Sequence, residues 1–486
     1  MATEHVDVLI VGAGLSGIGA ACHLVRDLPD TSYMILEARD AIGGTWDLFN
    51  YPGIRSDSDM HTLGYRFRPW PESRILADGP SIKKYVEDTA AEYGVDKQIR
   101  FGHKVISSDW DSETARWTIT YQQGGEQGAQ KMGTVTANFL WNCSGYYSYD
   151  EPHRPEFPGE ERFQGQIIHP QLWPEDLDYA GKKVVVIGSG ATAITLVPSM
   201  AGTAEHVTML QRTPTYVLSV PGKDPVDSTL KKILPDDLVS YVARWRNVGL
   251  QAALYQASKR QPALVKRGIR ASQQAQLPKD FDVDPHFAPP YNPWDQRLCV
   301  VPDGDLFRAI RRGDASIETG HIDRFTETGI RLQDGTEIEA DIIITATGLT
   351  MLAFGGATMT VDGGELKLGD HVTYKGLMLD GVPNFAFVIG YSNASWTLKA
   401  DLVSEYVVRL LKRMQKDGTR VVTPVRPDDL GTKPIMDLSS GYISRAQGNF
   451  PQQGDRGPWK SPANYFRDLV VLRHRPITDK SLEFTA

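Results

Sequence analysis

The feature that most constrains the fold is a pattern that occurs twice along the chain. Each copy consists of a β-branched apolar run, a glycine-rich turn and an alanine-rich stretch with apolar residues at helical spacing. The first copy covers residues 6–27 (VDVLIVGAGLSGIGAACHLVRD) and the second covers residues 182–201 (KKVVVIGSGATAITLVPSMA). A strand, a tight turn and a helix in this order open a parallel βαβ unit. We therefore expect an α/β fold in which one such domain is inserted into another.

The first turn carries glycines at the three positions of a dinucleotide-binding fingerprint, with Ser16 inside it. Gly12 permits a tight turn, Gly14 lets the backbone approach a pyrophosphate, and Gly17 allows the helix to pack closely. Glu37 ends the next apolar run (SYMILE), where an acid accepts hydrogen bonds from a ribose hydroxyl. An acid there suits a ribose without a 2′-phosphate. The turn predicts FAD or NAD, and these residues alone do not choose between them.

The second turn repeats the pattern with alanine in place of the third glycine. Its candidate cofactor-binding residues are Gly188, Ser189, Gly190, Ala191, Thr192 and Ala193. The strand that follows (HVTMLQRTP) ends in Gln211, Arg212 and Thr213, without a carboxylate. Because an arginine can bind a 2′-phosphate that an acid would repel, this site favours NADPH over NADH. Two Rossmann-like dinucleotide sites in one chain predict an FAD at the first site, which is reduced by a nicotinamide at the second.

The length of the chain, 486 residues, exceeds what a single core supports, so we expect several domains. Residues 1–150 are expected to form the first part of the FAD domain, and residues 151–220 the linker with the first part of the NADP domain. Residues 221–290 have helical spacing and predict a helical subdomain, which either caps the site or packs against the core. Residues 291–345 would complete the NADP domain. Residues 346–486 would complete the FAD domain and form a C-terminal tail with little functional signal.

Composition excludes several other classes of protein. The formal net charge is −8 without a basic block, so a nucleic-acid partner is not expected. The N-terminus lacks the basic region of a signal peptide, and no apolar run reaches membrane-spanning length, so we expect a cytoplasmic protein without a transmembrane segment. The three cysteines form no CxxC pair, which argues against a disulfide reductase. No metal site is expected.

Two longer motifs carry a resemblance to a known family. Residues 163–174 (FQGQIIHPQLWP) match the FxGxxxHxxxW fingerprint of type I Baeyer–Villiger monooxygenases, and residues 43–57 (GGTWDLFNYPGIRSD) match a second motif of that family. The stretches YPGIRSDSDM, PYNPWDQRLC and NASWTLKADLVSE are similar to mycobacterial members. The resemblance covers most of the chain.

The resemblance implies a reaction. NADPH reduces FAD, the reduced flavin traps O₂ as a C4a-peroxide, and an oxygen atom is inserted beside a ketone carbonyl to give an ester or lactone. Sulfides or thioamides would be oxidised as well, so the expected partners are O₂ and a small apolar ketone or sulfide. Chemistry of this kind belongs to the cofactor, while the protein positions and tunes it.

The resemblance also implies roles for individual residues. Arg297, in WDQRLC, would be the catalytic arginine that stabilises negative charge at the flavin, and Asp57 would pair with it. His169 would lie in the linker and couple the domains rather than transfer protons. The lysine that often precedes the arginine is Gln296 here, so the binding of NADPH would depend more on Arg212 and Thr213. The residues expected to line the flavin are Gly44, Thr45, Trp46, Asp47, Leu48, Arg55, Ser56, Asp57 and Val105.

Two other functions remain open at this point. One is a flavin monooxygenase limited to S- or N-oxidation, and the other is an NADPH-dependent reductase that uses FAD as an electron relay. A non-catalytic flavin-binding protein is disfavoured, because a sensor needs no second dinucleotide. Five aromatic residues are considered for a substrate pocket, although a place in the hydrophobic core is the simpler interpretation of each. They are Tyr65, Phe67, Trp70, Trp294 and Trp396.

Overall fold

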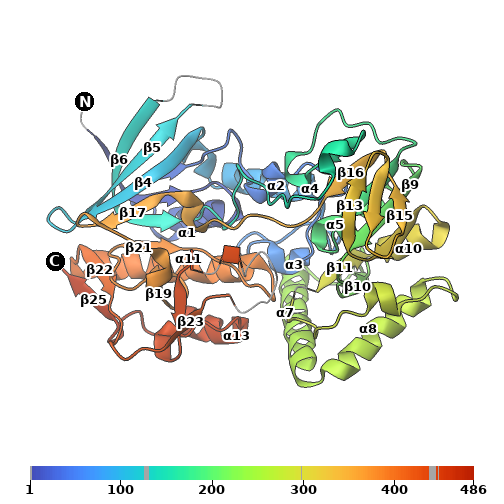
Figure 1. Ribbon diagram of the computed structural model, residues 1–486. Coiled ribbons are helices and arrows are strands. Elements are labelled where there is room, and N and C mark those ends of the chain that lie inside the picture. The colour runs from blue at the N-terminus through green and yellow to red at the C-terminus, as the bar shows by residue number, and fades with distance from the viewer. Residues whose placement is uncertain (1–2, 125–130, 297, 437–444, 447) are drawn as a thin grey trace.

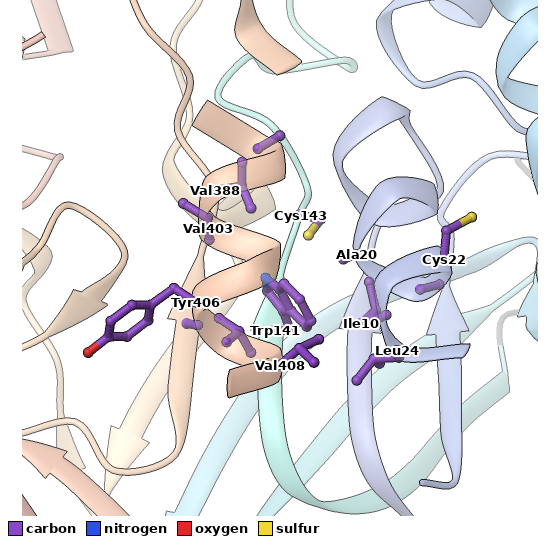
Figure 2. Close-up of a cluster of buried hydrophobic side chains, with 14 of the residues drawn as sticks. Ile10, Ala20, Cys22, Leu24, Trp141, Cys143, Val388, Val403, Tyr406 and Val408 are labelled. Atoms are coloured by element: carbon purple, nitrogen blue, oxygen red, sulfur yellow. The ribbon is translucent and has the colours of Figure 1, made fainter. Parts of the chain in front are cut away.

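The first glycine turn belongs to a parallel sheet of five strands. The computed structural model describes residues 3–124, 131–296, 298–436, 445–446 and 448–486. The strands, in spatial order, are β3 (Ile99–Arg100), β2 (Tyr33–Leu36), β1 (Glu4–Val11), β6 (Lys131–Asn142) and β21 (Phe385–Phe387). Helix α1 (Leu15–Asp27) packs between this sheet and helix α11 (Trp396–Asp417). Ile10 and Trp141 of the sheet and Leu24 of α1 are fully buried in the resulting core, which Figure 2 shows.

The second glycine turn belongs to another five-stranded parallel sheet. Its order is β12 (Ala315–Thr319), β9 (His206–Gln211), β8 (Lys183–Ile187), β16 (Ile342–Thr345) and β7 (Gln166–Ile168). The runs KVVVI and IIIT have no polar alternation because both faces of the sheet are covered. Helices α5 (Ala191–Met200) and α10 (Asp305–Arg312) contact each other and supply buried residues to the same core.

Each parallel sheet is accompanied by an antiparallel meander. In the first domain the meander is β4 (His103–Asp111), β5 (Arg116–Gln123) and the first half of β6, whose second half pairs with β21. In the second domain it is β13 (Ile322–Thr326), β14 (Gly329–Leu332) and β15 (Glu337–Glu339). The two domains therefore share one architecture, which confirms the predicted fold class of two Rossmann-like domains.

The helical subdomain is also present. It contains α6 (Pro225–Leu230), α7 (Asp236–Arg260), α8 (Pro262–Gln276) and α9 (Asp284–Phe287), of which α7 and α8 extend below the second domain in Figure 1. The structure places α7 against α3 (Met60–Leu63) of the first domain. The boundaries assigned to the segments from the sequence remain predictions.

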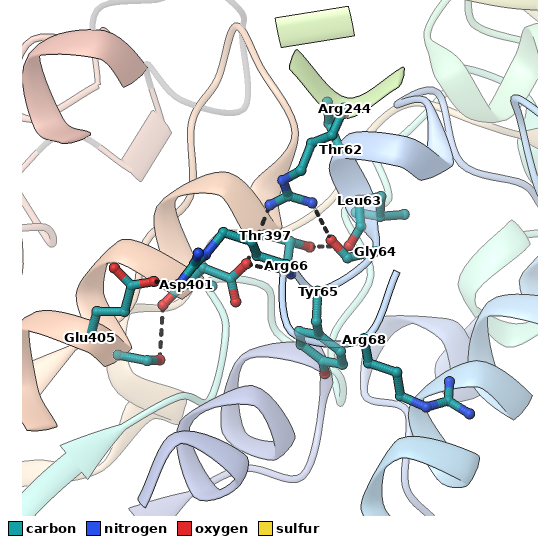
Figure 3. Close-up of polar contacts among 12 residues, drawn as sticks. Thr62, Leu63, Gly64, Tyr65, Arg66, Arg68, Arg244, Thr397, Asp401 and Glu405 are labelled. Carbon is teal, nitrogen blue, oxygen red and sulfur yellow. Dashed lines mark hydrogen bonds and ion pairs between the residues drawn. The ribbon is translucent and has the colours of Figure 1, made fainter. Parts of the chain in front are cut away.

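A buried arginine fixes this contact between the subdomain and the first domain. Arg244 of α7 donates to the carbonyl oxygens of His61 (3.1 Å) and Gly64 (2.7 Å) and to the carboxylate of Asp401 (3.3 Å), as Figure 3 shows in part. Asp401 lies on α11 and also accepts from the backbone N–H of Arg66 at 2.9 Å. Since a buried charge is tolerated only when it is paired and hydrogen-bonded, this cluster specifies how the two parts dock.

The remaining elements belong to the first domain and the C-terminal segment, except β10 (Val217–Val220) and β11 (Cys299–Pro302), which pair beside the second domain. The others include α2 (Thr45–Leu48), α4 (Gly79–Glu92), β17 (Thr358–Val361), β18 (Gly364–Glu365), β19 (Val372–Tyr374), β20 (Met378–Leu379), β22 (Val421–Pro424), β23 (Thr432–Pro434), β24 (Gln452–Gly454), α13 (Tyr465–Asp468) and β25 (Leu482–Thr485). Within the described residues, no helix combines the length and apolar character needed to cross a bilayer. The same residues bring together no cluster of side chains suited to hold a metal ion.

Candidate functional site

The first turn has the geometry of a phosphate cradle. Gly12 has φ +100°, and a Cβ there would lie 2.8 Å from the carbonyl oxygen of Cys143. A Cβ at Gly17 would lie 1.8 Å from the carbonyl oxygen of Gly12, so the turn and the helix pack too closely for any side chain. Helix α1 begins directly after Gly14, and its N-terminal N–H groups and dipole favour an anion there. The residues present fit the pyrophosphate of a dinucleotide.

Glu37 occupies the position expected for a ribose ligand. It follows β2, is buried, and accepts hydrogen bonds from the backbone N–H groups of Ala13 (2.6 Å) and Arg39 (2.9 Å). Burial raises the pKa of Glu37, and the two N–H groups oppose that shift. The carboxyl group is therefore held rigidly beside the glycine turn, with both contacts supplied by backbone.

A cavity of about 1460 Å³ opens in front of this turn and extends to the second domain. A pocket for one drug-sized ligand typically measures ~300–1,000 Å³, so this cavity has room for more than one such ligand. It reaches Ala191 and Thr192, the first residues of α5. The other residues predicted at the second site do not line it, and these are Gly188, Ser189, Gly190, Ala193, Arg212 and Thr213. Of the predicted residues, those that line it are Gly12, Gly14, Ser16, Glu37, Gly44, Thr45, Trp46, Asp47, Arg55, Ser56, Asp57, Val105, Ala191 and Thr192.

Among the residues predicted for the first turn and the flavin, two lie behind the cavity wall instead. Gly17 is buried against Gly12, which is its expected packing role. Leu48 is buried in the hydrophobic core of the second domain, next to Phe49 and Tyr51. The loop that begins with the Gly43–Gly44 pair therefore bridges the two domains, and Leu48 anchors it there.

Two charged residues of this loop have protein partners. Asp47 contacts Arg39 at 2.6 Å and Lys83 at 2.7 Å; burial would raise its pKa, and the two cations outweigh that effect and lower it. Arg55 contacts Asp305, at the start of α10, at 2.5 Å. Arg55 thus ties the cavity wall of the first domain to the second domain. Its role toward a cofactor stays a prediction.

The second turn has the same strained first glycine. Gly188 has φ +139°, and its Cβ would lie 2.3 Å from the carbonyl oxygen of Ala346, whereas Gly190 has open space around it at the start of α5. Ala193 is fully buried, as close helix packing requires. Ser189 donates to the carbonyl oxygen of Thr213 at 3.0 Å, which connects the turn to the end of β9. A ligand phosphate can approach at Gly190.

Two neighbouring residues at the end of β9 differ in exposure: Gln211 is buried and Arg212 is exposed. Gln211 is buried, and its amide donates to the carbonyl oxygen of His286 (2.8 Å) and to Thr319 Oγ1 (2.9 Å). Arg212 is exposed, and none of the described residues forms a hydrogen bond or ion pair with its side chain. The arginine is therefore available to a phosphate, and Gln211 is not.

The predicted catalytic pair is described only in part. Asp57 lines the cavity, whereas Arg297 lies outside the described residues. Next to it, Leu298 is buried and leads into β11. Gln296, the departure from the family pattern, is half-buried and forms an isolated bridge with Pro293.

The fingerprint segment joins the domains. His169 is buried and does not line the cavity; its Nδ1 accepts from the backbone N–H of Gln171 at 3.2 Å. The side chain of Gln171 in turn donates to the carbonyl oxygens of Ser148 (3.0 Å) and Tyr149 (2.9 Å) in the segment that leaves the first domain. Burial lowers the pKa of His169. These contacts favour a positioning role over proton transfer.

An aromatic wall completes the cavity. Trp396 donates from Nε1 to Ser16 Oγ at 2.7 Å and stacks on Tyr146, with ring centroids 5.1 Å apart. Tyr147, Tyr149 and Tyr391 also line the cavity, and none of these tyrosines was predicted. The sequence signal for Tyr146, Tyr147 and Tyr149 is the segment CSGYYSYD, which follows the carboxyl end of β6 beside the first turn. Of the aromatic residues considered from the sequence, Trp396 lines the cavity, and Tyr65 and Trp70 are core residues.

Comparisons with known proteins identify the family of this chain. The sequence profile of the family described as flavin-binding monooxygenase-like matches residues 5–355. The chain is 54% identical over 485 residues to the FAD-containing monooxygenase EthA of Mycolicibacterium smegmatis, which covers 99% of this chain and 98% of that protein. It is 49% identical over 489 residues to the putative FAD-containing monooxygenase MymA of Mycobacterium tuberculosis, with coverage of 99% and 98%.

Solved structures share the fold. A polycyclic ketone monooxygenase from Thermothelomyces thermophila superposes with a TM-score of 0.77 at 18% identity, covering 100% of this chain and 90% of that one. An open structure of cyclohexanone monooxygenase gives 0.75 at 19% identity and covers 100% of both chains. An oxidized steroid monooxygenase bound to NADP gives 0.69 at 24% identity and covers 87% and 88%. From its profile match and its full-length relatives, the chain belongs to the flavin-binding monooxygenase-like family.

Proposed function

We propose that this chain is an NADPH- and O₂-dependent Baeyer–Villiger monooxygenase, with FAD at the first glycine turn and NADPH at the second. The observation that carries the proposal is the single cavity that contains the first turn, with Glu37, and also the start of α5 at the second turn. Hydride transfer requires the nicotinamide to reach the flavin, and a shared cavity permits it. The relatives named as FAD-containing monooxygenases and the neighbour bound to NADP support this choice of cofactors.

The residues of this chain would bind and orient the two cofactors. The N-terminus of α1 would bind the FAD pyrophosphate, Glu37 a ribose hydroxyl, and Arg212 the 2′-phosphate of NADPH. When bound, the flavin supplies the reduction of O₂ and the transfer of one oxygen atom. The tyrosines and Trp396 along the wall favour a small apolar substrate over a charged one.

The catalytic assignment is Arg297 paired with Asp57, by resemblance to the family. A guanidinium stays charged at every working pH and can stabilise an oxyanion that develops on the substrate. Arg297→Ala should leave reduction of the flavin by NADPH intact and abolish ester formation, and Arg297→Lys should restore part of it. Lactone production that persists in Arg297→Ala would remove this residue from the mechanism.

A double-mixing experiment tests the overall function. The enzyme is reduced anaerobically with NADPH, mixed with oxygenated buffer, and followed through the flavin absorbance. We expect a long-lived, blue-shifted spectrum that decays faster when cyclohexanone is present, with an ester as product. Immediate return of the oxidised spectrum with stoichiometric hydrogen peroxide would indicate a reductase or oxidase.

The family itself leaves one alternative, a monooxygenase limited to S- or N-oxidation. Ketone and sulfide competition distinguishes the two, because both substrates would draw on the same oxygenating form of the enzyme. Products from both substrates, each suppressed by the other, would support the Baeyer–Villiger assignment. Sulfoxide formation with no ester from any ketone would support the narrower activity.

A further inference from the structure

A second cavity, of about 750 Å³, lies in the C-terminal segment that Figure 1 draws in red around α13. It is formed by Lys375, after β19, and by residues between 457 and 481. None of its lining residues lines the large cavity. The flavin chemistry proposed above assigns no role to it.

A buried lysine forms part of its wall. Lys375 has only 4% of its side chain exposed; its Nζ lies 3.2 Å from Asp479 Oδ2 and donates to the hydroxyl of Tyr406 at 3.2 Å. The ring of Tyr374 lies 4.9 Å from the same Nζ. Burial lowers the pKa of Lys375, and the charge of Arg475 adds to that effect. Lys375 is therefore neutralised largely by Asp479 and forms the inner wall of the cavity.

The lining carries more positive than negative charge. Its two acids already have buried lysine partners: Asp479 contacts Lys375, and Asp468 contacts Lys399 at 2.7 Å. The cavity is also lined by Lys460, Arg467, Arg475 and Lys480. None of these four cations forms an ion pair with a carboxylate of the described residues. Such a concentration of positive charge in a chain of net charge −8 favours an anionic ligand.

An apolar strip continues from the rim of this cavity. Val470 lines the cavity with 48% of its surface exposed, and Phe466, one turn earlier, is 44% exposed. The ring of Phe466 stacks on Trp245 of α7, with centroids 6.5 Å apart, and Tyr241 follows on the same helix at 63% exposure. Contiguous exposed apolar side chains of this kind mark a binding surface more often than isolated ones do.

We propose that the C-terminal cavity binds an amphiphilic anion, with a carboxylate or phosphate head at the lysines and arginines and an alkyl chain along Val470, Phe466 and Trp245. Both parts of the ligand contribute to binding, because the cations bind the charged head and the strip binds the alkyl chain. A free amphiphile and an anionic lipid headgroup in a membrane share this chemistry. The experiment below distinguishes a ligand in solution from a lipid in a membrane.

The test uses the full-length protein and decyl phosphate, kept below its micelle concentration, in isothermal titration calorimetry. The double variant Arg475→Gln, Lys480→Gln removes two exposed rim charges, so it should fold normally and weaken binding about tenfold. The control variant Lys131→Gln, Lys182→Gln removes the same charge from exposed positions in the two nucleotide domains and should bind like wild type. Binding should weaken as salt is raised.

Further ligands test which part of the amphiphile is recognised and whether it is a soluble molecule or a membrane lipid. Inorganic phosphate and decanol should each bind more weakly than decyl phosphate. Sedimentation with vesicles of phosphatidylglycerol, lost in the rim variant, would assign the ligand to a membrane; decyl phosphate binding without sedimentation would assign a soluble amphiphile. Affinity for decyl phosphate that is absent, or equal in the rim variant and wild type, would overturn the proposal.

Discussion

Arg212→Ala offers a quantitative test of how the second turn distinguishes NADPH from NADH. The guanidinium is exposed at the end of β9, its neighbour Gln211 is engaged inside the protein, and none of the described side chains competes for Arg212. A hydrogen bond between charged groups contributes about 1.5–3 kcal/mol, and exposure to solvent places this contact at the lower end. A loss of about 1.5 kcal/mol corresponds to roughly a tenfold higher KM for NADPH.

The assay compares the KM of both dinucleotides in steady-state oxidation. NADH has no 2′-phosphate, so its KM should change less than about twofold. Arg212→Lys should retain only part of the preference, because it keeps the charge and loses the bidentate geometry. Arg324→Ala, at another exposed position on β13, is the matched control and should change neither value. Equal increases for NADPH and NADH in Arg212→Ala would refute the reasoning, since the arginine would then not read the 2′-phosphate.

Three further predictions concern stability. Gly17→Ala forces a methyl group onto a backbone carbonyl, so it should cost about 3 kcal/mol and release FAD on gel filtration, whereas Gly249→Ala, in open space on α7, should slightly raise the melting temperature. Arg244→Met strands buried Asp401 and should cost about 3 kcal/mol in urea unfolding; a loss under about 1 kcal/mol would contradict the docking role. Burial lowers the pKa of His23, but the carboxylates beside it prevail and raise it, so its stabilisation is complete below pH 6.5 and disappears as pH rises through the folded-state pKa. The free energy of unfolding of His23→Gln, measured by urea titration at several pH values, should therefore lack this pH-dependent loss. A pH dependence equal to that of the wild type would contradict the prediction.

The glycine turns and the acid after β2 could be predicted because their geometry is local. A tight turn, a close helix packing and an acid at the next strand end are all encoded within about thirty residues, the length of one βαβ unit. Local rules failed at Leu48, whose neighbours Gly44 to Asp47 do line the cavity but which itself enters the core of the other domain.

The aromatic wall and the domain contacts could not be predicted because they join distant segments. Trp396 meets Ser16 only after α11 has packed on α1, and no pattern around either residue indicates the other. The buried acid Asp401 looks like an ordinary helix-surface residue in the sequence WTLKADLVSE, and its partner Arg244 lies on another subdomain. A single sequence reports periodicity along the chain and carries no signal of this kind of pairing.

The domain contacts explain how the first turn and the start of α5 come to line one cavity. Arg55 and Asp305 connect the cavity loop with α10 of the second domain, and Arg244 connects α7 with α3 and α11 of the first. Both connections use ion pairs, and each stabilises the docked arrangement because a charge left without its partner is costly to bury. The two domains are therefore held together by these ion pairs and by the apolar contact of Leu48 with the core of the second domain, whereas the parallel sheets are built by local rules.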